Sequence, residues 1–427
     1  MAFRAICLPH GRWDESKIDE REISRRLQIR VHVAQVFAFF ETPGLGMYYA
    51  IARLGAIAAG AASRTDFAPG MSVFAGAFTY VGFPSIGWRQ LQRAEAITRT
   101  IEDAEMRGSF LAFAAPVYVG SGDREQAESN FKEAISLLAK AGAHWQATYA
   151  AHIYRHLLQF VGSSSREIAA GEKVLSIAES IGDIRAQAWG QYDTACGLAR
   201  GGDVCTALAR LDRAQELIDM AEEAGTTRSI FLATKGFVLL QASDYAGARQ
   251  AANTSWDICK SKRFFMEYNS LSLPLLIQSI LGPHWNEMAV TERELLKRLL
   301  WQSRLLLVTH PALHSVIHRS RGRACWALGR RRKAVRSFRR AIQAAERFGS
   351  DFDRAKSLLD LAAVQTESRD QAIQEAITLL KQQESVIPYA ERWLLGDQYD
   401  ETVVAPPPNS KEEQGVALRE EAASKET

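Results

Sequence analysis

The chain has 427 residues, of which 47% are hydrophobic and 24% are charged, and its formal net charge at pH 7 is +3. This length exceeds one ordinary packed core, which leaves either several domains or an array whose units pack only against their neighbours. The low net charge excludes a protein that attracts polyanions through its overall field, so only a local basic patch could do so.

The cysteines and the N-terminus indicate the compartment. Five cysteines lie far apart and form no CxxC pair, which is typical of thiols in a reducing compartment. Arg4 and Arg12 are not followed by an apolar segment with a cleavage site, so no secretion signal is predicted. We therefore expect a cytoplasmic protein.

Residues 1–66 are predicted to form an atypical helical cap. A charged and then apolar helix is expected over 19–40 and an Ala-rich helix over 44–62, and terminal units of an array differ because one face has no neighbour. The next stretch, 67–88, is uncharged and long enough to cross a bilayer, but it contains Pro69, Pro84 and several glycines. We assign it to the array and not to a membrane span.

A repeat of about 40 residues runs through 67–399. Its clearest unit places small, large and small side chains at helical spacing, with a Gly-Asp turn before them and Gly142 after them. The corresponding positions are Ala127, Phe131 and Ala134; Leu91 and Ala94; Ala207, Leu211 and Ala214; and Ala334, Phe338 and Ala341. Twelve residues before the small anchor stands another small residue, at Ala75, Ala115, Ala195, Gly236 and Gly322. Helices that cross at close range require this pattern, so we predict an all-α superhelix of antiparallel hairpins.

These residues resemble the tetratricopeptide (TPR) signature, although the period exceeds the usual one of about 34. The sequence looks most similar to the long-period TPR regions of large bacterial signal-transduction proteins, such as nucleotide-binding regulators of the maltose-activator type, adenylate cyclases and protein kinases. The resemblance implies a sensing or docking arm that binds a peptide or protein partner. The chain could also be the separated C-terminal part of such an ATPase, cyclase or kinase.

Two regions depart from the pattern. Over 269–311, Pro274 and Gly282-Pro283 interrupt apolar helices, and a degenerate unit is expected there, with an amphipathic Leu- and Arg-rich helix over 291–307. Residues 400–427 contain three consecutive prolines and a charged tail, and we expect them to be disordered.

No motif of an enzyme stands out. GxxxxGK[ST], HExxH and GxSxG are absent, and no GxGxxG follows a strand, so we predict a non-enzymatic protein without a cofactor. Two histidine pairs, His152/His156 and His314/His318, have the i, i+4 spacing of metal ligands, but no acidic residue lies near them in sequence. We therefore predict no metal site.

A basic face over 319–340 is the main charge feature. An acidic protein or peptide is the favoured partner, a nucleic acid is an alternative that the scarcity of stacking aromatics opposes, and a solvated face or self-association stays open. The candidate contact residues on this face are Arg323, Arg330, Arg331, Arg332, Lys333 and Arg336. On the first helices we name Tyr118, Tyr154 and Tyr192 as candidate groove residues.

Overall fold

The computed structural model describes residues 102–405 except 223–224, 263–264, 283–289, 366–367 and 399. Before these it describes residues 20, 23–25, 27–29, 31–32, 35, 45–58, 64–80 and 84–98. Over this part of the chain the protein is all-helical, and its only bridge between extended segments joins Ile387 to Val404. The predicted all-α fold class is confirmed.

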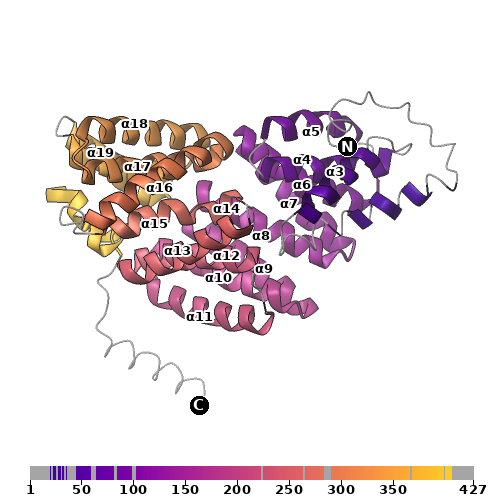
Figure 1. Ribbon diagram of the computed structural model, residues 1–427. Coiled ribbons are helices and arrows are strands. Elements are labelled where there is room, and N and C mark those ends of the chain that lie inside the picture. The colour runs from indigo at the N-terminus through magenta and orange to yellow at the C-terminus, as the bar shows by residue number, and fades with distance from the viewer. Residues whose placement is uncertain are drawn as a thin grey trace, which may run out of the picture.

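Consecutive helices pair as antiparallel hairpins that stack into a superhelix (Figure 1). The pairs are α4 (Arg64–Tyr80) with α5 (Pro84–Thr98), α6 (Ala104–Ser121) with α7 (Arg124–Lys140), α8 (His144–Val161) with α9 (Ser164–Ile181), α10 (Ile184–Gly201) with α11 (Val204–Met220), and α12 (Thr226–Gln241) with α13 (Tyr245–Lys262). They continue with α15 (Ser272–Leu281) and α16 (Val290–Thr309), α17 (His314–Ala327) and α18 (Arg331–Phe348), and α19 (Asp351–Val364) and α20 (Arg369–Gln382).

Gly-Asp pairs make several of the turns between helices. Gly122, Gly182 and Gly202 end their helices with φ of 87°, 69° and 99°, a conformation that glycine adopts without steric cost. The aspartates that follow, Asp123, Asp183 and Asp203, each accept a hydrogen bond from a backbone N–H in the first turn of the next helix. One dipeptide thus ends one helix and begins the next.

Small side chains lie where the helices of a hairpin cross. A Cβ added at Gly322 would lie 2.4 Å from the ring of Phe338, and one added at Gly87 would lie 2.5 Å from the carbonyl oxygen of Ala75. All the positions that the sequence marks as repeat anchors are buried in the structure. Their size therefore sets the distance between helices.

The predicted degenerate unit is a hairpin of unequal helices. Its first arm is the short α14 (Glu267–Ser270) followed by α15, and its second arm is α16. α15 packs against α12, α13 and α17, so the unit keeps its place in the stack although the anchor pattern is missing.

The C-terminal hairpin folds back onto the middle of the array and closes the superhelix. The backbone N–H of Ser164 donates to the carbonyl of Gln383 at 3.0 Å, and that of Val386 donates to the carbonyl of Arg200 at 2.8 Å. α19 also packs against α8, which lies about 200 residues earlier in the chain. Helices of distant hairpins therefore surround a common interior.

The predicted boundaries need correction at both ends of the array. The first hairpin begins at Arg64, three residues before the predicted start of the array at 67. Val403 and Val404 are buried against the last hairpin, so the prediction of a disordered tail from residue 400 is wrong for 400–405. Residues 406–427 lie outside the described residues, as does most of the predicted cap. Within the predicted cap, the described helix α3 (Leu45–Ala58) packs on α4.

The structure also tests for a membrane span. Among the described residues, no helix combines the length and the apolar character that crossing a membrane requires.

Candidate ligand-binding cavity

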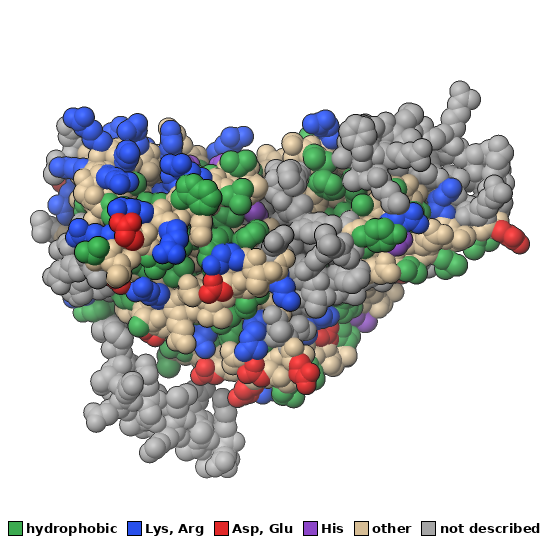
Figure 2. All heavy atoms as spheres, viewed as in Figure 1, with side chains coloured by type: hydrophobic (Ala, Val, Ile, Leu, Met, Phe, Trp, Pro, Cys, Tyr) green, Lys and Arg blue, Asp and Glu red, His purple; other side chains and the backbone are tan. Residues whose placement is uncertain are grey.

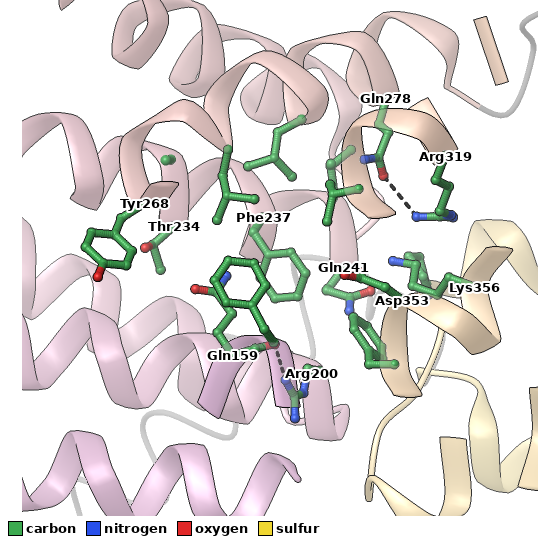
Figure 3. Close-up of a pocket in the computed structure, with 18 of the residues that line it drawn as sticks. Gln159, Arg200, Thr234, Phe237, Gln241, Tyr268, Gln278, Arg319, Asp353 and Lys356 are labelled. Carbon is green, nitrogen blue, oxygen red and sulfur yellow. Dashed lines mark hydrogen bonds between the residues drawn. The ribbon is translucent and has the colours of Figure 1, made fainter. Parts of the chain in front are cut away.

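A hollow lies inside the closed superhelix. It holds about 920 Å³ of space outside protein atoms, including its opening to solvent, and first helices of the hairpins line it (Figure 3). Most of the side chains come from α8, α10, α12, α15, α17 and α19. The others are Tyr245 of α13, Tyr268 of α14, Leu271, and Pro388 and Glu391 of the C-terminal segment.

The lining side chains recur at a constant interval along the chain. One row is Gln159, Arg200 and Gln241, a second is Phe237, Gln278 and Arg319, and a third is Thr234, Leu275 and Val316. Neighbours in a row are 41 residues apart, as in the hydrogen bonds from Arg200 to the carbonyl of Gln159 and from Arg319 to the side chain of Gln278. The interval equals the repeat length, so equivalent positions of successive first helices face one space.

Gln241 is the most informative side chain of the wall. It is 2% exposed, yet neither its amide nitrogen nor its amide oxygen has a hydrogen-bond partner among the described residues. Gln278, by contrast, accepts from Arg319 at 3.3 Å and donates to Ser320 at 3.0 Å. A buried amide without partners is costly, and in a cavity wall it marks a place where a ligand could pair with it.

Charges of both signs border this amide. Arg319 lies 3.6 Å from Glu391 in an ion pair, and Lys356 and Asp353 also line this end of the cavity, which α17, α19 and the C-terminal segment form. Burial, together with the charge of Arg319, lowers the pKa of Lys356 to about 7. Burial raises the pKa of Glu391, but Arg323, Lys356 and Arg319 outweigh it and hold this pKa well below its usual range. The rest of the wall combines apolar and aromatic side chains with polar ones such as Gln159, Thr234 and Gln278 and with the charged Arg200.

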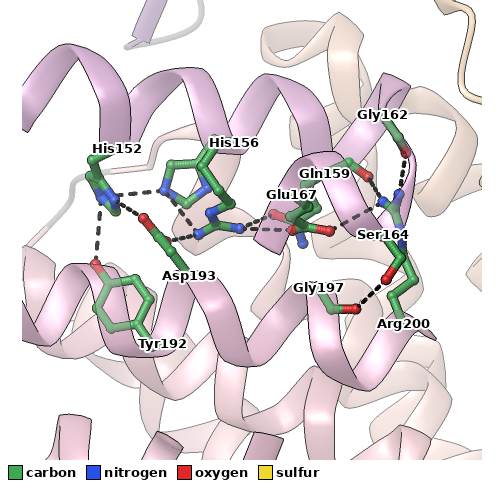
Figure 4. Close-up of polar contacts among 11 residues, drawn as sticks. His152, His156, Gln159, Gly162, Ser164, Glu167, Tyr192, Asp193, Gly197 and Arg200 are labelled. Carbon is green, nitrogen blue, oxygen red and sulfur yellow. Dashed lines mark hydrogen bonds and ion pairs between the residues drawn. The ribbon is translucent and has the colours of Figure 1, made fainter. Parts of the chain in front are cut away.

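A network of buried charges supports the opposite wall (Figure 4). Arg155 of α8 pairs with Asp193 of α10 and, at 3.3 Å, with Glu167 of α9. Glu167 also lies 3.3 Å from Arg200, whose guanidinium stands 5.2 Å from the centre of the Phe352 ring in the cavity wall. Paired, fully buried charges of this kind hold three helices in one register.

The fold brings an acidic residue to the first histidine pair. Nδ1 of His152 lies 2.7 Å from Asp193, and the possible ligand atoms of His152, His156 and Asp193 lie within 4.8 Å of one another. Arg155 already pairs with Asp193, and its guanidinium is 3.4 Å from Nε2 of His156. A metal ion here would face this fixed positive charge, so the geometry suits hydrogen-bonded histidines better than a metal centre. Burial and Arg155 lower the pKa of His156 well below its usual range, so this imidazole is neutral.

The second pair shows a similar use of histidine. Nε2 of His314 lies 2.8 Å from the carbonyl oxygen of Leu307, and His318 stands one turn further along α17. Burial, with the charges of His314 and Arg321, lowers the pKa of His318 to about 4. The absence of a metal at either pair stays a prediction.

The aromatic residues predicted for the groove do not line the cavity. Tyr192 is fully buried beside His152 and Phe231, and Tyr118 is buried with its hydroxyl donating to Glu95 at 2.5 Å. Tyr154 is half-buried and donates to Glu128 at 3.2 Å. The side chains of these tyrosines pack between helices, and their contact with a partner stays a prediction. The 41-residue interval is the feature of the sequence that points to the lining of this cavity.

The predicted basic face divides into inward and outward arginines. Arg323, with Arg319, turns inward to pair with Asp360 and Glu391, so its assignment to an exposed contact face is wrong. Arg331 is exposed but donates to the carbonyl of Val364 at 2.6 Å and so caps α19. The remaining candidates, Arg330, Arg332, Lys333 and Arg336, are exposed.

Comparisons with known proteins add a fold likeness only. No family model and no curated protein matches the chain. Among solved structures, it is similar to the crystal structure of a Rap protein complexed with competence and sporulation factor, at 14% sequence identity and a TM-score of 0.44, over 85% of this chain and 88% of that one. At this level, the likeness supports no inference about function, and the cavity has to be interpreted from its own residues.

Proposed function

We propose that the protein binds a short peptide in extended conformation inside its superhelix, and that it acts by holding this peptide and not by chemistry on it. The observation that supports this most directly is Gln241, whose buried amide faces the cavity with both hydrogen-bonding ends unpaired. A primary amide donates and accepts at once, which is the complement of one peptide unit of a backbone.

The rest of the wall suits the same ligand. Apolar side chains such as Phe237, Leu240 and Leu275 can take up side chains of a peptide. At one end of the cavity, Arg319 and Glu391 are held by ion pairs with Asp360 and Arg323, so the charges that a ligand meets there are fixed in place. The closed superhelix gives the site a fixed shape, which lowers the entropic cost of binding.

Two buried thiols, Cys196 and Cys259, are unsuited to nucleophilic chemistry. Burial raises the pKa of Cys196 well above its usual value and that of Cys259 to about 12. Both remain protonated at neutral pH, and the thiol is the unreactive form. We infer a scaffold or regulatory arm, for which an acidic ligand and a place in signal transduction remain proposals.

Affinity selection tests this function. A library of random synthetic hexapeptides is passed over the immobilised protein, and enriched peptides are measured by fluorescence anisotropy on the wild type and on Gln241→Met. We expect at least tenfold weaker binding to the variant, and unchanged binding to Gln343→Met, which alters an exposed glutamine of α18. Mass spectrometry should find the bound peptide intact. Enriched peptides that bind Gln241→Met as well as the wild type, or no enrichment at all, would contradict the proposal.

A further inference from the structure

The outward face of α16 carries an apolar stripe that the fold does not use. Trp301, Leu305 and Val308 are 70%, 59% and 78% exposed. Their spacing of four and then three residues places them on one side of the helix, over about 10 Å of its length. Single exposed apolar residues are common, but three aligned ones form a contact surface.

The opposite side of α16 already accounts for its place in the array. Leu296, Leu299 and Leu306 are buried in the core together with residues of α15 and α17. Among the described residues, those that line the cavity include none from α16. The stripe is thus required neither by the packing of α16 nor by the proposed peptide site.

Arginines flank the stripe. Arg298 and Arg304 of α16 are exposed beside it. Arg321 of α17 donates to the carbonyl of Leu300 and to the hydroxyl of Ser303, both at 2.7 Å, which fixes its guanidinium against α16. Burial and the nearby charges of Arg304 and Arg340 lower the pKa of Arg321. The guanidinium groups of Arg304, Arg321 and Arg340 therefore gather at one edge of the stripe.

The carboxylates of α16 do not neutralise this edge. Glu292 accepts from Arg249 at 2.8 Å, and Glu294 accepts from Lys297 at 2.6 Å. Beyond Arg340, the exposed surface of α18 adds Arg332, Lys333, Arg336 and Arg339. In this part of the molecule, Lys and Arg side chains surround hydrophobic ones (Figure 2).

We propose that the stripe Trp301–Leu305–Val308 and its arginine rim form a docking site for an acidic amphipathic helix of a partner protein. A helix with apolar residues at i, i+4 and i+7 matches the stripe in spacing and length, and Asp or Glu beside them match Arg304, Arg321 and Arg340 in charge. A nucleic acid would need a series of stacking aromatics, whereas the stripe has one. An interfacial membrane helix needs a long apolar face, whereas this stripe extends over only two turns.

A designed helix tests the site. The probe is a stapled, fluorescein-labelled 18-residue peptide with Leu at i, i+4 and i+7, Glu on both flanks and Ala elsewhere. Two control peptides carry Lys in place of Glu, or the same residues in scrambled order. We expect the Glu peptide to bind at least tenfold more tightly than either control in fluorescence anisotropy, and its binding to weaken as salt is added.

Matched variants locate the contact. Trp301→Ser, and the double change Arg304→Glu with Arg340→Glu, should each weaken binding at least tenfold. Met220→Ser, which alters another exposed apolar side chain, and Lys173→Glu, an exposed cation of α9, should leave binding unchanged. Gln241→Met should also bind normally, so failure of the peptide cavity and failure of this surface are distinguishable. Circular dichroism melts show that each variant is folded.

Three results would overturn the proposal. Equal binding of the Glu, Lys and scrambled peptides would remove the role of charge and spacing. Binding of the Glu peptide that survives both sets of changes would place it elsewhere. Binding to phosphatidylserine vesicles or to a DNA duplex, with no binding of the Glu peptide, would assign the surface to a membrane or a nucleic acid instead.

Discussion

Replacing Gln241 by Met should stabilise the protein while removing its ligand binding. Met is unbranched and of similar length, so it can occupy the same space beside Phe237 and Leu240 in the cavity wall. The change removes two buried polar atoms that lack partners among the described residues. An unpaired polar group costs more when buried than when hydrated, so its loss favours the folded state.

The size of the gain follows from this desolvation cost. Leaving a buried amide unpaired costs about 1–3 kcal/mol. The entropy of unfolding is about 2.1 cal/mol/K per residue, or roughly 0.9 kcal/mol/K for the 427-residue chain unfolding as one unit. The melting temperature should therefore rise by about 1–3 °C. Water bound to the amide inside the cavity would reduce the gain toward zero.

Differential scanning calorimetry on the ligand-free protein measures the shift, with Gln343→Met as the exposed control. A selected peptide is then added to both proteins. It should raise the melting temperature of the wild type, because it binds only the folded state, and leave Gln241→Met unchanged. A clear fall in the melting temperature of ligand-free Gln241→Met would show that the amide has a partner within the protein, and the reasoning for the cavity would fail.

Three further predictions concern the framework around the cavity. Arg155→Met should cost about 3–5 kcal/mol in urea unfolding, because it leaves buried carboxylates unpaired, whereas Arg213→Met in an exposed pair should cost less than about 1 kcal/mol. The pKa of Lys356 is about 7 in the folded state, against about 10.4 for an ordinary lysine, so the folded state binds fewer protons than the unfolded state between these values. The urea midpoint of unfolding should therefore rise from pH 7 to pH 10, and Lys356→Met should abolish this rise. Gly322→Ala should cost about 1–3 kcal/mol because its methyl group meets the Phe338 ring, and Phe338→Leu should recover part of the loss in a double-mutant cycle.

The repeat could be predicted because its determinants are local. Gly322 and Phe338 meet across one hairpin, sixteen positions apart, and the same spacing separates Ala75 from Leu91, Ala115 from Phe131 and Ala195 from Leu211. The Gly-Asp turns are likewise contained in two adjacent residues. Such contacts repeat with the unit, and a period search along the sequence detects them.

The lining of the cavity was not predicted, for a related reason. Aromatic residues on first helices suggested groove contacts, but helix packing can bury such a residue as easily as it can expose it, and Tyr192 is buried. Polar residues repeated at the unit length were the better guide. Gln278, Arg319 and Asp360 follow one another at intervals of 41 and are linked by hydrogen bonds, which neighbouring first helices can form only on their shared inner face.

Closure of the superhelix has no comparable signal in the sequence. Arg200 donates to the carbonyls of Gln159 and Gly162, stands against Phe352, and accepts through its own carbonyl from the N–H of Val386. These partners come from three parts of the chain, and most of the bonds involve backbone atoms, which every residue has. The cavity exists because these contacts hold the last hairpin against the middle of the array. A local period therefore specifies how each hairpin is built, whereas the curvature summed over many hairpins decides which of their faces meet.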